Sequence, residues 1–179
     1  MHLFKHQLKN IEDRVLSCPS KLAIIGPITY SNLDHVLYTL SCGKFDYIAV
    51  IDTWDGREDV KEDFHDLVIS SKLEDIVFEF HKDCQDSLNY FPNNYFDIVY
   101  FYKESDDIDP CARSVDIGKY IKKIKNAGFL SGSDYSKVKQ MVNIVTETPE
   151  DNEFLYCKED DSWILCIYNS QIYQLLTLE

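Results

Sequence analysis

The chain has 179 residues, of which 45% are hydrophobic and 27% charged, with only 6 Gly and 5 Pro. This composition predicts one folded globular domain and excludes collagen-like and intrinsically disordered classes. The 18 Lys and Arg against 31 Asp and Glu give a formal net charge of −13, so we expect no direct binding of nucleic acid, which is itself a polyanion. The acidic charge fits a soluble surface, and it also fits a DNA-mimicking decoy or inhibitor.

The sequence also indicates in which cellular compartment the protein is expected. No apolar run approaches the roughly 20 residues that span a bilayer, and the first residues lack the apolar core of a signal peptide. The 6 Cys are scattered without a Cys-x-x-Cys pair, which favours reduced thiols over disulfides or a zinc site. We therefore expect a cytoplasmic protein that does not associate with membranes.

The hydrophobic pattern alternates between helical and strand-like segments. The elements expected in chain order are a helix over 3–16, a strand over 21–26, a helix over 30–40, a strand over 47–52, a helix over 58–70, a strand over 76–80, a short helix over 84–91, a strand over 96–101, a helix over 111–125, a strand over 129–132, a helix over 136–146, and two final strands over 154–157 and 163–168. The apolar runs of the strands are continuous, as in parallel sheets covered on both faces. Gly128 is expected to end the helix over 111–125.

This order predicts an α/β fold. We expect a Rossmann-like, doubly wound, seven-stranded sheet that is mostly parallel, with an antiparallel C-terminal hairpin and helices on both faces. We also expect a single domain over 1–179, with an N-terminal helix in 1–20, a βα core in 21–146 and the hairpin in 147–179.

Ligands of such sheets bind beyond the carboxyl ends of the strands, at the topological switch point. An acid at the end of the second strand is the residue that bonds ribose hydroxyls in nucleoside-binding sheets, and Asp52 stands there. A carboxylate offers two acceptor oxygens to the two hydroxyls of a vicinal diol. The alternative is that Asp52 caps the next helix or faces solvent.

Four segments together resemble class I S-adenosylmethionine-dependent methyltransferases, from about Lys21 to Val145. The resemblance is to the branch that methylates hydroxyls of sugars and other small molecules. IAVIDTWDG at 48–56 matches the family's V-x-A-x-D-x-W-D-G, and KDC at 82–84 matches its G-D-S. FDIVYF at 96–101 matches the first half of F-D-L-V-F-I-D-G-D-H. AGFLSGSDY at 127–135 matches G-G-x-L-x-G-H-D-Y, and the VKQMV that follows it matches V-K-x-A-V.

The sequence departs from the family where its chemistry is done. The acid that ends the family's first strand is Ile24 here, and the second glycine of its Gly-rich turn is Tyr30, whose phenol ring is expected in the space that the ligand needs. Pro27 removes one backbone N–H from the same turn. The D-G-D-H that ends the fourth strand is Tyr-Lys-Glu-Ser at 102–105, and Ser133 replaces a histidine after the fifth.

The resemblance implies S-adenosylmethionine as cofactor and a set of site residues. The cofactor-binding residues would be Gly26, Pro27, Ser31, Asp52, Trp54, Asp83 and Cys84. Asp134 would be the base and Tyr135 a positioning group in catalysis, while Glu104 and Asp134 would form at best a weak magnesium site. Two alternatives stay open, because Asp134 suits an N-cap and Trp54 suits packing in the core.

Three functions remain open at this point. The first is a methyltransferase that acts on a hydroxyl of a small molecule or saccharide. The second is a catalytically inactive binding or regulatory module, which the altered first motif favours. The third is the acidic decoy. A protein partner or a second copy of the chain could dock on the apolar stretch from Ile172 to Leu178, whose alternative role is ordinary packing.

Overall fold

A single mixed sheet organises the chain in the computed structural model, which describes residues 20–42, 45–102, 117–133, 154–157 and 162–167. Its strands are β1 (Ser20–Ile25), β2 (Phe45–Ile51), β3 (Val77–Phe80), β4 (Phe96–Phe101), β5 (Ile124–Gly132), β6 (Phe154–Cys157) and β7 (Ser162–Ile167). The helices are α2 (Tyr30–Cys42), α3 (Glu58–Ser70), α4 (Cys84–Ser87), the 3-10 turn η1 (Leu88–Tyr90) and a helical stretch over 117–121.

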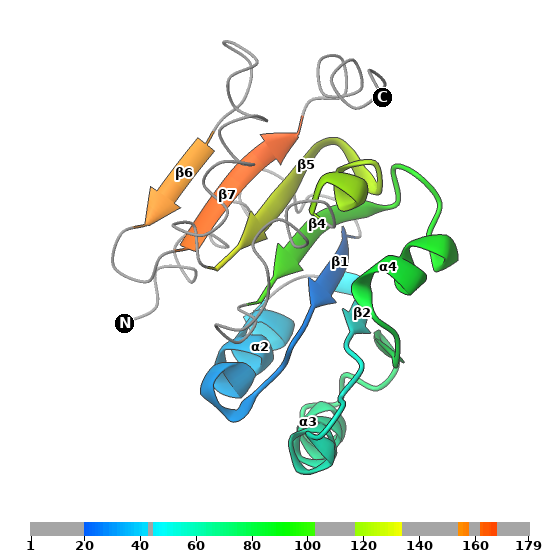
Figure 1. The fold of residues 1–179 in the computed structure, drawn as a ribbon. Helices are drawn as coiled ribbons and strands as arrows, with labels where there is room; N and C mark the ends of the chain where they lie inside the picture. Colours follow the sequence, from blue (N-terminus) through cyan, green and yellow to red (C-terminus); the bar gives the residue numbers. More distant parts are fainter. Residues whose placement is uncertain (1–19, 43–44, 103–116, 134–153, 158–161, 168–179) are drawn as a thin grey trace.

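The seven strands lie in the order β3-β2-β1-β4-β5-β7-β6 (Figure 1). Strands β1 to β5 pair in parallel, whereas β7 runs antiparallel to both β5 and β6. The chain leaves β1 toward one edge of the sheet and returns to continue from β4 toward the other. The Rossmann-like α/β architecture expected from the sequence is thereby confirmed, and the switch point lies between β1 and β4.

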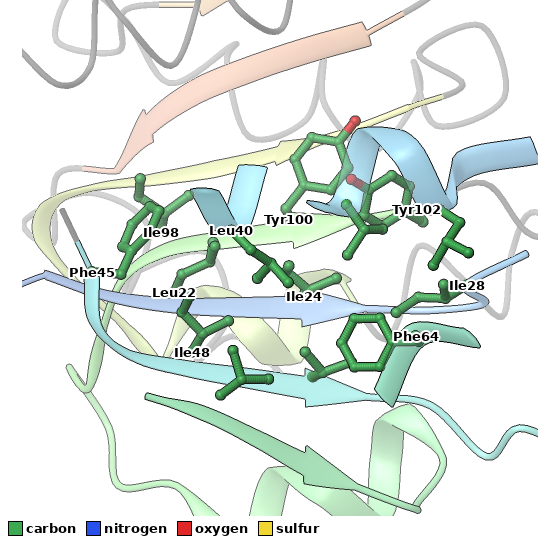
Figure 2. Close-up of a cluster of buried hydrophobic side chains, with 14 of the residues drawn as sticks. Leu22, Ile24, Ile28, Leu40, Phe45, Ile48, Phe64, Ile98, Tyr100 and Tyr102 are labelled. Atoms are coloured by element: carbon green, nitrogen blue, oxygen red, sulfur yellow. The ribbon is translucent and has the colours of Figure 1, made fainter. Parts of the chain in front are cut away.

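Helices cover both faces of the sheet because both faces of its central strands are apolar. On one face, the side chains of α2 and α3 pack on alternate residues of β1, β2 and β4, with Phe64 among those fully buried. Figure 2 shows Ile28, Phe64 and Tyr102 of this cluster toward the arrowhead end of β1 and β2. On the other face, the helical stretch over 117–121 contributes Ile117 and Tyr120 to a second core cluster.

The predicted helix over 111–125 is wrong at its C-terminal end. Its helical residues end at Ile121, and Ile124 begins β5 and pairs with Phe96. Gly128 therefore lies within a strand and does not end a helix. Its role is close approach, because a Cβ at Gly128 would lie 2.7 Å from the carbonyl oxygen of Asp97 on the neighbouring strand.

Several predicted elements lie outside the described residues, namely the helices over 3–16 and 136–146 and the stretch 172–178. Among the helices that the structure describes, none combines the length and the apolar character needed to cross a bilayer.

Candidate functional site at the carboxyl ends of the strands

The residues that follow β1 to β5 meet at one edge of the sheet, as expected from the parallel pairing. Backbone hydrogen bonds between neighbouring strands continue one residue past the strand ends. They join Gly26 N–H to Ile51 O (2.8 Å), Asp52 N–H to Phe80 O (3.1 Å), Tyr102 N–H to Ile25 O (2.9 Å) and Ser133 N–H to Phe101 O (3.1 Å). Asp52 consequently sits beside the turn that leaves β1.

Asp52 is buried, with an exposed fraction of 5%, and its carboxylate is bonded on both oxygens. Oδ1 accepts from the Trp54 N–H at 2.9 Å and from Arg57 Nη2 at 2.6 Å. Oδ2 accepts from the Ile28 N–H at 2.7 Å and from Arg57 Nη1 at 2.9 Å. A carboxylate has about four lone-pair sites. The acceptor capacity of Asp52 is therefore filled by donors of the same chain.

Arg57 reaches Asp52 because the chain reverses after β2. The Arg57 N–H donates to Trp54 O at 2.9 Å, and Gly56 adopts φ 66°, a left-handed conformation that glycine takes without strain. The guanidinium also donates to Ile28 O at 2.6 Å and lies 5.9 Å from the centre of the Trp54 ring. Its hydrogen bonds to Asp52 raise the pKa of Arg57 further above its usual range, against the lowering effect of burial. This bidentate, charge-assisted pair is a strong class of polar contact.

The turn from Gly26 to Thr29 keeps its backbone donors for the protein itself. The Gly26 N–H bonds Ile51 O, Pro27 has no N–H, and the Ile28 N–H bonds Asp52. The Thr29 N–H donates to Asn32 Oδ1 at 2.8 Å. A Gly-rich turn binds a ligand through backbone N–H groups that point at it. Here each of those groups already has an internal acceptor.

The two aromatic residues flanking this turn lie in opposite environments. Trp54 is 3% exposed and packs against Phe64, with 5.5 Å between the ring centres, and its indole N–H is buried with no acceptor among the described residues. Tyr30 is 57% exposed, and its hydroxyl donates to Asp59 Oδ2 at 3.2 Å on α3. Tyr30 therefore lies at the surface with its hydroxyl bonded to α3, and its place in the ligand space stays a prediction. Ile28 takes the inward position, because its side chain joins the core beneath α2.

The other predicted cofactor residues are dispersed around the edge. The Ser31 hydroxyl bonds the Thr29 hydroxyl at 2.8 Å on the exposed surface. Asp83 caps α4, where its carboxylate accepts the Asp86 N–H at 2.7 Å. Cys84 is partly buried and packs on the second core cluster. The cofactor role of these residues stays a prediction.

Replacing Asp83 by Ala is expected to lower the free energy of unfolding by about 1 kcal/mol, because the first turn of α4 loses its cap. Asp83→Asn is the matched control, since asparagine caps a helix as well as aspartate does. Urea denaturation measures both changes. Equal losses in the two variants would show that the cap hydrogen bond contributes little.

The predicted catalytic and metal-binding residues Asp134, Tyr135 and Glu104 lie outside the described residues. Within the described part of the chain, no group of three or more His, Cys, Asp or Glu side chains is arranged to hold a metal ion. The magnesium site stays a prediction, because both of its residues lie outside the described part of the chain.

Arg57 is the residue of this site that the sequence interpretation missed. The available signal was an arginine five positions after the acid, with a Trp-Asp-Gly turn between them. A turn there brings a long cationic side chain back toward the carboxylate. Periodicity alone places Arg57 only at the start of the helix over 58–70, where a charged residue is commonplace.

Comparisons with known proteins identify the fold. No protein-family profile and no curated protein sequence matches the chain. Among solved structures, a methyltransferase from Geobacter sulfurreducens superposes with a TM-score of 0.64 at 11% identity, covering 92% of this chain and 78% of that one. A candidate rRNA methylase from Clostridium thermocellum gives a TM-score of 0.59 at 12% identity, covering 90% and 94%. A Corynebacterium glutamicum protein gives 0.68 at 10% identity, covering 93% and 82%. The chain therefore has a methyltransferase-like fold.

Proposed function

We propose that this protein is a non-catalytic member of the methyltransferase fold that works as a binding or regulatory module. The observation that carries the proposal is the filled carboxylate of Asp52. The two Arg57 N–H groups and the backbone N–H groups of Ile28 and Trp54 occupy its two oxygens. The residues present do not fit the ribose of S-adenosylmethionine at the position where the resemblance puts it.

A ribose could reach Asp52 only by displacing Arg57. Its two hydroxyls would also make charge-assisted hydrogen bonds to the carboxylate, but the buried carboxylate would lose its cation, and breaking a buried ion pair costs about 3–5 kcal/mol. Hydrogen bonds to charged groups contribute about 1.5–3 kcal/mol each. Each 1.4 kcal/mol of the broken ion pair that the hydroxyls do not recover would weaken ligand binding about tenfold.

The turn after β1 supports the same conclusion. Methionine carries a carboxylate, which in a nucleotide-type turn would be held by free backbone N–H groups. From Gly26 to Thr29 the described donors are used internally, and Pro27 supplies none. Within the turn from Gly26 to Thr29, no backbone N–H is left for the carboxylate of the cofactor.

Titration calorimetry of the wild-type protein with S-adenosylmethionine and S-adenosylhomocysteine tests the proposal. We expect no binding heat at millimolar ligand. Binding at micromolar ligand that disappears in Asp52→Ala would overturn the proposal, because it would show that the cofactor displaces Arg57 and uses the carboxylate. Asp97→Ala, at the opposite end of the sheet, controls for a general loss of stability.

The second candidate is an S-adenosylmethionine-dependent methyltransferase acting on a hydroxyl of a small molecule or saccharide. The likeness to methyltransferase structures and the position of Asp52 directly after β2 favour it. In this candidate Asp134 takes the acceptor's proton and Tyr135 positions the acceptor. The same titration decides between the candidates, because catalysis requires the cofactor to bind.

A further inference from the structure

We infer that Arg57 is a built-in occupant that keeps a vicinal-diol site at Asp52 closed, and that shortening this side chain opens the site to a ribonucleoside. The inference rests on the proposed function, in which the wild-type protein does not hold the adenosyl group. It goes beyond that proposal by assigning the closure to one side chain.

The guanidinium has the donor pattern of a diol. Nη1 and Nη2 donate to Oδ2 at 2.9 Å and to Oδ1 at 2.6 Å, one donor to each carboxylate oxygen. A vicinal diol presents two adjacent O–H donors to the same pair of oxygens. Arg57 therefore takes the acceptor positions that a ribose would use.

Arg57 is the more exposed partner of the ion pair. Its side chain is 22% exposed, whereas the side chain of Asp52 is 2% exposed. Removing the guanidinium therefore frees one acceptor position on each carboxylate oxygen. Gly26 borders the carboxylate on another side and adds no side chain, and a Cβ there would lie 2.5 Å from Oδ2.

The carboxylate remains positioned without Arg57. The Ile28 N–H and the Trp54 N–H hold one oxygen each, at 2.7 and 2.9 Å. These donors belong to the backbone, so they persist in an Arg57 variant. Each oxygen keeps one lone pair for a ligand hydroxyl.

The test compares adenosine with 2′,3′-dideoxyadenosine, which lacks the diol, by titration calorimetry on Arg57→Ala. We expect adenosine to bind this variant at least tenfold more tightly than the dideoxy compound, and neither to bind the wild type. A folded Arg57→Ala protein that binds neither nucleoside, or both equally, would overturn the inference. In Asp52→Asn/Arg57→Ala, the preference for the diol should vanish.

Arg57→Lys keeps the experiment decisive if the alanine variant does not fold. An ammonium preserves a cation beside the buried carboxylate, but it is a point charge and cannot cover both oxygens as a guanidinium does. We expect weaker but diol-dependent binding of adenosine, and its absence in a folded Lys variant would also overturn the inference. Diol-dependent binding by the wild type would instead refute the proposed function, so the two failures are distinguishable.

Discussion

Gly26→Ala is expected to lower the free energy of unfolding by about 3 kcal/mol, as overpacking against a fixed group does. The new Cβ would lie 2.5 Å from Oδ2 and 2.7 Å from Cγ of Asp52. The carboxylate cannot yield easily, because Ile28, Trp54 and Arg57 hold it. Relief of the clash therefore breaks part of this network. Urea denaturation at unchanged m-value measures the loss.

Gly118→Ala is the matched control for this substitution. Gly118 lies in the helical stretch over 117–121, and an added Cβ meets nothing within 4 Å. Alanine there should raise the free energy of unfolding by about 0.5–1 kcal/mol through its helix preference. If Gly26→Ala proved as harmless as Gly118→Ala, the tight contact between the turn after β1 and Asp52 would be refuted.

Arg57→Ala is expected to cost about 3 kcal/mol, because it leaves a buried carboxylate without its cation. A double-mutant cycle with Asp52→Ala should give a coupling energy of about 2 kcal/mol, as for directly bonded groups. Thermal or urea unfolding of the wild type, the two single variants and the double variant yields this value. A coupling energy near zero would show that the pair contributes nothing to stability.

Lys125→Ala supplies the comparison for the cycle. Lys125 pairs with Asp97 at 2.8 Å, but its side chain is 38% exposed. Pairs at the surface contribute about 0–1 kcal/mol and weaken with salt. We therefore expect a smaller loss than for Arg57→Ala, and a loss that shrinks at high ionic strength.

The sequence predicts the fold well because continuous apolar runs of β-branched and aromatic residues mark the buried strands. The bounds expected for 58–70 and 96–101 are those of α3 and β4. The largest boundary error falls at Ile124, where an apolar residue with helical spacing pairs instead with Phe96. Such a boundary is decided by pairing with a strand that is distant in the sequence, and local periodicity gives no information about that pairing.

The candidate site was predictable only in part. The place of Asp52 follows from the strand order, since an acid after β2 must lie at the carboxyl edge of the sheet. Whether Arg57 bonds the carboxylate of Asp52 depends on the turn over 54–57. In this turn Trp54, a non-glycine residue, adopts φ 61°. This conformation is rare and gives no local sequence signal. The turn after β1 likewise has no local signal for which residue is buried: Ile28 joins the core, whereas Tyr30 is exposed.

We propose that the carboxylate of Asp52 bonds Arg57 in the wild-type protein and binds no nucleoside. A crystal structure of the wild-type protein, determined from crystals grown with millimolar S-adenosylhomocysteine, tests this most directly. We predict that Arg57 Nη1 and Nη2 still bond the two oxygens of Asp52 and that no adenosyl group stands beside Gly26. Ribose hydroxyls bonded to Asp52, with the guanidinium turned away, would contradict the account.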